Sequence, residues 1–210
     1  MKKKMSDNKN IIYLVVFILV FLFILMDVFR HQVTSYDNWA YQVFVEDLRN
    51  DNLTSIMKVI TSLGSAIFIG AAAALLFLLY KNKKDVYILL LNTVIIVVIN
   101  DFIKFVVHRS RPIGYNLINE TNYSFPSGHS MVSTFFYGFL IYLVYKEISN
   151  KKLKYLIISI LALLIILICI SRIYLGVHYL SDTIAGFALS MTYIMILLVY
   201  NKKHKGKKEQ

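Results

Sequence analysis

Residues 153–200 read LKYLIISILALLIILICISRIYLGVHYLSDTIAGFALSMTYIMILLVY, and this stretch decides the fold. It contains two long apolar runs, Leu153–Ile170 and Leu180–Tyr200, separated by a short segment that is more polar. A membrane-spanning helix needs about 20 predominantly apolar residues. Within lipid the backbone polar groups must bond to one another, so each run is predicted to form a helix. The two runs therefore predict a pair of helices that cross a membrane and meet at a polar connection.

Four more apolar runs precede this pair along the chain. They are Ile11–Met26, Ile56–Tyr80, Val86–Val107 and the shorter Met131–Tyr145. Hydrophobic residues make up 58% of the 210 residues and the mean hydropathy is +0.61, more than is typical of a soluble domain of this size. We predict an all-α integral membrane protein, one six-transmembrane-helix bundle over residues 1–210, with disordered basic termini at about 1–10 and 201–210.

The basic residues are distributed unevenly among the connections between the runs. Of the 23 lysines and arginines, 16 fall on one side of a six-span layout, and the formal net charge is +11. These 16 are Lys2, Lys3, Lys4 and Lys9, then Lys81, Lys83 and Lys84, then Lys146, Lys151, Lys152 and Lys154, then Lys202, Lys203, Lys205, Lys207 and Lys208. The positive-inside rule predicts that this side, with both termini, is cytoplasmic in a multi-pass cell-membrane protein. Contact with anionic lipid accounts for the basic tail, so no nucleic-acid partner is predicted.

The connection between the first two runs, Asp27–Ser55, lies outside the cell on this topology and contains an amphipathic pattern. Its apolar residues recur at helical spacing: Trp39, Ala40, Val43, Phe44 and Leu48. This pattern is typical of a helix that lies in the membrane interface. We expect an external amphipathic helix that either anchors the protein passively or forms a side gate through which a lipid reaches a site.

Small residues recur at every fourth position in two of the runs. They are Ala66, Gly70 and Ala74 in the second run, and Gly186 and Ser190 in the last, where Asp182 precedes them at the same spacing. Such stripes let helices pack closely in lipid, so both are predicted to face neighbouring helices. Asp182 is an ionisable group at the membrane and needs a partner, for which His178 is the nearest candidate.

Three polar motifs fall at span ends on the predicted external side. They are Lys104 with Arg111-Pro112 after six intervening residues, then Pro126-Ser127-Gly128-His129, then Ser171-Arg172 with His178 and Asp182 downstream. Arginine presents a planar fork that matches phosphate oxygens, and lysine a compact charge. The N–H groups of Ser127 and Gly128 lie at a predicted helix start, with Ser127 as the N-cap, and suit an anion. Together the motifs predict a site that binds a phosphate group.

The two histidines in these motifs supply the chemistry of bond cleavage. His178 and Asp182 are predicted to share a helix face, where the carboxylate would fix the imidazole tautomer and leave one ring nitrogen free to attack phosphorus. His129 would protonate the leaving oxygen and then activate water. Each motif alone also has a structural interpretation, and a metal site formed by His129, His178 and Asp182 is an alternative. Three nearby cations and a single carboxylate disfavour that alternative.

Two residues beside the first motif, His108 and Arg109, do not belong to it. They would add positive charge for a diphosphate, but the segment Arg109–Tyr123 is polar and has the composition of a loop. We interpret both residues as part of an exposed loop.

Taken together, the three motifs resemble the signature of the type 2 phosphatidic-acid phosphatase superfamily, and the six-span layout resembles its short bacterial membrane members. The match is complete at Lys104, Arg111, Pro112, Pro126, Ser127, Gly128, His129, Ser171, Arg172, His178 and Asp182. The resemblance implies a helical bundle and metal-independent dephosphorylation through a phosphohistidine, without a cofactor. It implies a nucleophile at His178, its orienting acid at Asp182, a general acid at His129, and phosphate ligands at Lys104, Arg111, Ser127, Gly128 and Arg172.

The resemblance further implies a membrane lipid phosphatase that acts at the outer leaflet, with a lipid phosphate and membrane lipids as its partners. An active site on the external side favours undecaprenyl diphosphate as the substrate, because the diphosphate form of this lipid carrier is released outside the cell. Phosphatidylglycerophosphate and phosphatidic acid are the alternatives. A transporter or flippase is disfavoured because the motif cations lie near span ends and not at mid-membrane. A lipid-binding scaffold without catalysis is disfavoured because His129, His178 and Asp182 are all present. Richness in Lys, Ile and Asn favours a bacterial source, and no oligomeric state is predicted.

Overall fold

The computed structural model describes the backbone of residues 2–208 and the side chains of residues 9–200. Helices are the only regular secondary structure in this described part, which confirms the all-α prediction. They are α1 (Lys2–His31), α2 (Ser35–Tyr41), the π-helical η1 (Gln42–Asp47), α3 (Asp51–Ser62), α4 (Ala66–Leu79), α5 (Lys83–Val107), α6 (Gly128–Glu147), α7 (Lys151–Tyr174) and α8 (Leu180–Lys208). The predicted disordered termini, at about 1–10 and 201–210, fall mainly on residues whose side chains lie outside the described part, and their disorder stays a prediction.

Four helical segments are long and apolar enough to cross a membrane. They are Lys9–His31, Lys83–Val107, Lys151–Tyr174 and Leu180–Tyr200. The pair α3 and α4 adds a fifth if the two helices count as one broken span. The predicted sixth span lies in α6, which is 20 residues long but carries several buried polar residues, among them Ser130, Ser133 and Thr134. The structure thus identifies a membrane protein with four or five apolar spans by length and composition.

The prediction of one continuous helix over Ile56–Tyr80 is wrong. The chain forms α3 and α4 instead, with a bend of 49° between them. Gly64 and Ser65 end α3 by donating their N–H groups to the carbonyl groups of Thr61 and Ser62. The Ser65 hydroxyl then accepts a hydrogen bond from the Phe68 amide at 3.2 Å and caps α4. Average hydropathy does not reveal this break, because the two helices taken together have the hydropathy of one membrane span.

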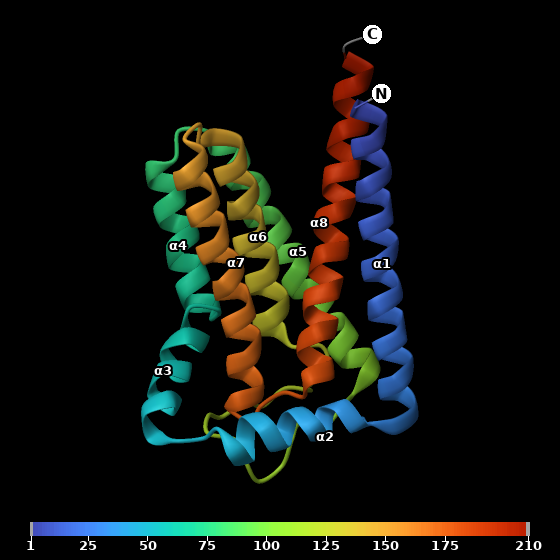
Figure 1. Cartoon of the computed structure of the whole chain (residues 1–210), viewed down its shortest axis with the longest axis vertical. Coiled ribbons are helices and arrows are strands. Elements are labelled where there is room, and N and C mark those ends of the chain that lie inside the picture. Colours follow the sequence, from blue (N-terminus) through green and yellow to red (C-terminus); the bar gives the residue numbers. More distant parts are fainter. Residues whose placement is uncertain (1, 209–210) are drawn as a thin grey trace.

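The long helices run side by side between two ends of the bundle (Figure 1). Both termini lie at one end, together with the connections between α4 and α5 and between α6 and α7. α2, the long loop after α5 and the connection between α7 and α8 lie at the opposite end, where α2 runs across the ends of the long helices (Figure 1). α6 is central, because it packs against α5, α7 and α8, while α1 packs against α8. The polar motifs therefore gather at the end far from the termini.

The interior between the helices is filled by buried apolar side chains, among them Leu89, Ile96, Phe135, Phe136 and Ile168. Lipid tails are as apolar as these side chains, so close packing and hydrogen bonds between helices hold the bundle together. One such bond joins α8 to α5, where the Tyr193 hydroxyl donates to the Asn92 side-chain oxygen at 2.5 Å.

The two small-residue stripes have different surroundings. In α8 the prediction is confirmed: Gly186 is buried against the start of α6, and the Ser190 hydroxyl donates to the Met131 carbonyl oxygen at 2.6 Å. In α4 it is wrong, because Ile69 and Ala73 are buried whereas Gly70 has nothing within 4 Å of an added Cβ. The spacing shows that close approach is sterically allowed, but it does not show which face has a neighbour.

Replacing Gly186 by alanine is expected to destabilise the protein. A Cβ atom there would lie 2.8 Å from the Ser127 carbonyl oxygen, so α6 and α8 would have to move apart. Overpacking of this kind costs about 1–3 kcal/mol, which corresponds to a fall of roughly 5 °C in the thermal midpoint in detergent. Gly70→Ala is the control, since its added methyl group meets open space and alanine favours a helix. An unchanged midpoint for Gly186→Ala would contradict the close contact between the two helices.

Candidate active site

The predicted site residues come from four helices and two connections at the end of the bundle opposite the termini. Lys104 is near the end of α5, and Arg111 is in the loop after it. Ser127 directly precedes α6, whose first two residues are Gly128 and His129. Arg172 is near the end of α7, His178 lies in the connection to α8, and Asp182 is in the first turn of α8. Electrostatic interactions connect Lys104 with Arg111 and Asp182, and His129 with Arg172, His178 and Lys104. The tertiary structure thus brings together the side chains that the sequence grouped by motif.

His178 and Asp182 form a direct contact, but they do not share a helix face as predicted. α8 begins at Leu180, so His178 lies in the turn before the helix and Asp182 is its third residue. His178 Nδ1 is 3.3 Å from Asp182 Oδ2. The same oxygen accepts hydrogen bonds from the Tyr179 N–H at 2.9 Å and from the Ser124 hydroxyl. An acidic side chain at this position of a helix reaches back to the N-cap amide, which fixes the carboxylate and, through it, the imidazole.

The other ring nitrogen of His178 faces a guanidinium group. Arg111 Nη1 lies 3.1 Å from His178 Nε2 and can only donate, so Nε2 is the unprotonated nitrogen and Nδ1 carries the proton. Burial lowers the pKa of His178 to about 4, with Arg111 and Arg172 adding to this effect and Asp182 opposing it. The imidazole is therefore neutral at neutral pH, with a lone pair on Nε2 directed at the cationic groups.

Two arginines surround a carboxylate beside this imidazole. The guanidinium of Arg172 is almost fully buried; its Nη1 donates to Thr61 Oγ1 at 2.8 Å and its Nη2 to Glu120. Glu120 also lies 3.6 Å from Arg111 Nη2. Burial by itself would raise the pKa of the Glu120 carboxyl. The positive charges of Arg172 and Arg111 outweigh this effect and lower the pKa below its usual value, so the group is an anion. Among the described residues Arg172 Nε is buried without a hydrogen-bond partner, so this site has donor capacity for another anionic oxygen.

The segment Pro126–His129 is held in place by its neighbours. Asn100 on α5 donates to the Pro126 carbonyl oxygen at 3.1 Å, and the Ser127 N–H donates to the backbone carbonyl oxygen of Asp182 at 3.0 Å. The Ser127 hydroxyl accepts from the Ser130 amide at 3.4 Å, which confirms Ser127 as the N-cap of α6. The polar groups of Ser127 are thus engaged within the protein, whereas the amides of Gly128 and His129 lie in the first turn, where a helix leaves N–H groups unpaired.

All eleven motif positions fall within residues 85–205, the part of the chain that matches the sequence model of the PAP2 superfamily. The chain belongs to the PAP2 superfamily. This match confirms the family resemblance inferred from the motifs.

Relatives of this PAP2 protein include two proteins with named activities. It is 34% identical over 112 residues to phosphatidylglycerophosphatase B of Bacillus subtilis, which covers 51% of this chain and 54% of that protein. It is 31% identical over 99 residues to dolichyldiphosphatase of Saccharomyces cerevisiae, which covers 44% of this chain and 41% of that protein. The matched regions therefore span about half of the length of these relatives.

Solved structures extend the similarity to nearly the whole chain. The PAP2 protein superposes on the crystal structure of a transmembrane PAP2-type phosphatidylglycerolphosphate phosphatase from Bacillus subtilis with a TM-score of 0.79 and 30% identity. This superposition covers 91% of this chain and 96% of that chain. The structure of LpxE from Aquifex aeolicus matches with a TM-score of 0.60 over 74% of this chain, at 24% identity, and so supports the fold alone.

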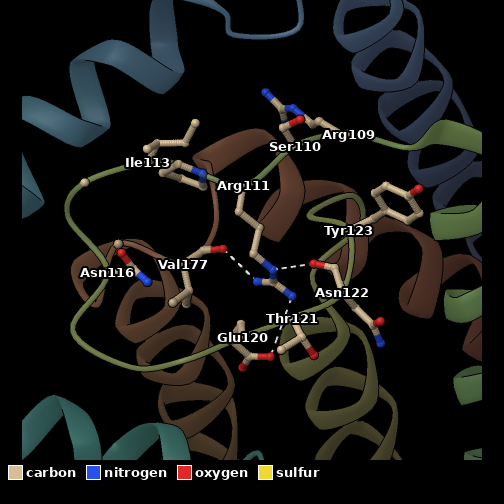
Figure 2. A pocket seen from close by; sticks show the side chains of 13 residues that line it. Arg109, Ser110, Arg111, Ile113, Asn116, Glu120, Thr121, Asn122, Tyr123 and Val177 are labelled. Atoms are coloured by element: carbon tan, nitrogen blue, oxygen red, sulfur yellow. Dashed lines mark hydrogen bonds and ion pairs between the residues drawn. The ribbon is translucent and has the colours of Figure 1, made fainter.

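Two cavities of the PAP2 protein are lined in part by motif residues: Arg111 and Pro112 line one, and Gly128 and His129 line the other. One, of about 660 Å³, has a lining of mixed polarity and lies within the loop after α5. Figure 2 shows the Arg111 guanidinium there, bonded to the carbonyl oxygens of Asn122 and Val177 and paired with Glu120. The other, of about 570 Å³, is mostly apolar, lies between α4 and α5 and reaches His129. Asn122 is among the lining residues of both cavities.

The interpretation of Arg109 as an exposed loop residue is wrong. Its side chain is 1% exposed and forms ion pairs with Asp182 at 2.6 Å and with Asp37 at 2.8 Å. Two buried carboxylates require a counter-charge, and Arg109 supplies it. The sequence did indicate that the Asp182 carboxylate needs a partner, but only His178 was predicted in that role, and Arg109 was not.

Three further residues at the site were not predicted from the sequence. Glu120, Ser124 and Asn100 contact motif residues from positions outside every motif. For Asn100 a signal existed, since it is a polar residue inside an apolar span and precedes Lys104 by one helical turn. The described side chains include no group of three or more His, Cys, Asp or Glu residues arranged to hold a metal ion.

Proposed function

We propose that this PAP2 protein is a membrane lipid phosphatase. The observation that carries the proposal is the orientation of His178: Asp182 holds Nδ1, while Nε2 faces the Arg111 guanidinium beside Arg172. A neutral imidazole aimed at a cluster of cations is suited to attack a phosphorus atom whose oxygens those cations bind. The adjacent apolar cavity suits the hydrocarbon part of a lipid.

The reaction proceeds in two steps that need no metal ion. His178 Nε2 attacks phosphorus, and the bond breaks from phosphorus to the lipid oxygen of a monophosphate or to the bridging oxygen of a diphosphate. His129, in its protonated imidazolium form, donates a proton to that oxygen and becomes neutral. His129 then takes a proton from water, whose oxygen attacks the phosphohistidine and releases phosphate and neutral His178. Three basic side chains bind the phosphoryl oxygens and stabilise their charge in both steps, namely Lys104, Arg111 and Arg172. The N–H groups of Gly128 and His129 at the start of α6 add to them, because the Ser127 N–H is already bonded to the Asp182 carbonyl oxygen.

The phosphate group would take the place of Glu120 between Arg111 and Arg172. The phosphate and the Glu120 carboxylate are both anions, and the buried Arg172 Nε offers the phosphate a hydrogen-bond donor that the carboxylate does not use. The chains of the lipid would then extend into the cavity between α4 and α5. Small residues make that volume available, because Ala66, Gly70 and Ala73 line it.

The site lies at the outer leaflet in this proposal. The lysine-rich connections between α4 and α5 and between α6 and α7 lie at the end that carries the termini, opposite the site (Figure 1). The positive-inside rule makes that end cytoplasmic. α6 then forms a sixth span, with its polar residues covered by neighbouring helices, and α2 with η1 forms an amphipathic helix in the outer interface, where Trp39 and Leu48 are exposed.

Two substrate candidates are supported by different observations. An outer-leaflet site favours a polyprenyl diphosphate such as undecaprenyl diphosphate, and the name of the yeast relative also refers to a polyprenyl diphosphate. The name of the Bacillus relative favours phosphatidylglycerophosphate. Phosphatidic acid remains a third substrate if the specificity is broad.

A panel of phosphate-release assays tests the proposal. The purified full chain in detergent with EDTA is offered undecaprenyl diphosphate, phosphatidylglycerophosphate, phosphatidic acid and a water-soluble ester. We expect at least one lipid to be cleaved with a kcat/KM at least about 10-fold above that of the soluble ester, because its chains bind the apolar cavity. Binding of these lipids without any phosphate release would instead favour a scaffold or transporter and overturn the proposal.

A further inference from the structure

Arg109 makes contacts that extend well beyond a simple loop anchor. Its Nη1 donates to Asp182 Oδ1 at 2.6 Å and to the Ser181 hydroxyl at 2.6 Å. Its Nη2 donates to Asp37 Oδ2 at 2.8 Å, and its Nε to the Gln32 carbonyl oxygen at 2.8 Å. Every nitrogen of the guanidinium is therefore bonded within the protein, although Arg109 is among the residues that line the cavity in the loop after α5. In Figure 2 its side chain extends away from the Arg111 guanidinium.

Asp37 brings the short helix α2 into the same network. Its side chain is fully buried; Oδ1 accepts from the Ser181 N–H at 2.8 Å and Oδ2 from the Ser181 hydroxyl at 2.9 Å. Asp37 also closes a capping box with Thr34 at the start of α2. The carboxylate thus links α2 to Arg109 and to the residue directly before Asp182.

The two oxygens of Asp182 have separate partners. Oδ1 accepts from Arg109, while Oδ2 lies against His178 Nδ1, the Tyr179 N–H and the Ser124 hydroxyl. Arg109 therefore fixes the rotation of the carboxylate so that Oδ2 stays with the imidazole. Although burial opposes its charge, Asp182 and Asp37 raise the pKa of Arg109, so it is a permanent cation between two buried anions.

We infer that Arg109 and Asp37 are positioning residues for the hydrolysis, acting through Asp182 on His178. This inference rests on the proposed function. A series of contacts runs from the Asp37 carboxylate on α2 through the Arg109 guanidinium to the Asp182 carboxylate and the His178 imidazole. The distances between the nitrogen and oxygen atoms in these three contacts are 2.8, 2.6 and 3.3 Å. The helix α2 is thereby part of the apparatus that orients the nucleophile.

Arg49 offers a matched control for a merely structural arginine. Its Nε and Nη2 donate to the Tyr174 carbonyl oxygen at 2.9 and 2.7 Å, so it also ties a distant segment to a helix end. It makes no contact with Asp182 or His178 among the described residues. Loss of this side chain removes comparable hydrogen bonds without touching the carboxylate.

The test compares four variants of the full chain in detergent: Arg109→Gln, Arg109→Lys, Asp37→Asn and Arg49→Gln. Initial rates on a lipid substrate from the panel, the burst of labelled phosphoenzyme and the thermal midpoint are measured for each. We expect Arg109→Gln to lower kcat and the rate of phosphoenzyme formation by about 10–100-fold with KM nearly unchanged, because a misaligned nucleophile affects the chemical step. Arg109→Lys and Asp37→Asn keep part of the network and should lose less. Arg49→Gln should lower the thermal midpoint but leave kcat of the folded protein unchanged.

A double-mutant cycle separates positioning from stability. If Arg109 acts through Asp182, the loss of kcat on Arg109→Gln should nearly vanish in an Asp182→Asn background. An equal loss in both backgrounds, or a change in the thermal midpoint alone for all three variants of Arg109 and Asp37, would overturn the inference. Should Arg109→Gln fail to fold, the loss of kcat is measured instead for Arg109→Lys and Asp37→Asn, each in the wild-type and the Asp182→Asn background. Full activity of Asp182→Asn itself would refute the proposed mechanism, which is a separate result.

Discussion

Replacing His178 by alanine abolishes phosphate release in the proposed mechanism. We expect kcat to fall by about 10⁴-fold or more, as for other enzymes that lose their nucleophile. The structure gives the reason: Nε2 of this residue faces Arg111, and Asp182 holds its other nitrogen. Steady-state phosphate release and trapping of an acid-labile phosphoenzyme measure the effect.

The control for this experiment is His31→Ala. His31 is an exposed histidine at the end of α1, paired only with Asp27 among the described residues, and its loss should leave turnover unchanged. A phosphoenzyme or full turnover in purified His178→Ala would show that another group attacks phosphorus.

Replacing His129 by alanine is expected to produce a loss that depends on the leaving group. His129 is the second residue of α6 and lines the apolar cavity, so it lies on the side from which the lipid oxygen would depart. A general acid contributes about 10²–10⁴-fold when the departing oxygen is a strong base. We therefore expect such a loss for an alkyl phosphate and a much smaller loss for p-nitrophenyl phosphate, whose leaving group needs little protonation.

The comparison of both substrates uses His178→Ala as its reference. That variant should lose turnover of both to the same extent, since every substrate needs the nucleophile. Equal losses for the two substrates in His129→Ala would assign His129 to phosphate binding and not to proton transfer.

Much of this architecture was predictable because the relevant signals are local. The length and apolarity of Val86–Val107, Leu153–Ile170 and Leu180–Tyr200 predict helices that the structure contains as α5, α7 and α8. Ser127 before a glycine predicted a helix start, and α6 begins at Gly128. In each case the cause lies within a few neighbouring residues, where hydrogen bonding and hydropathy act directly.

The bend between α3 and α4 shows the limit of such signals. α3 and α4, of 12 and 14 residues, together have the composition of one span, and only the turn at Gly64 and Ser65 separates them. The same limit applies to α4, where the stripe Ala66, Gly70 and Ala74 does not pack closely against another helix. Two of these small residues line a cavity instead, because the face of a helix that has a neighbour depends on the other helices.

The linear order of residues determined the helical class of this PAP2 protein, its insertion in a membrane, its family and the types of side chain available for chemistry. Only the tertiary structure decided how those side chains are paired. Arg109 is 72 or more residues from both of its carboxylate partners, and Glu120 is 52 residues from Arg172. A buried charge selects its partner by proximity after folding, and no local pattern of charge or hydropathy encodes a contact over such separations.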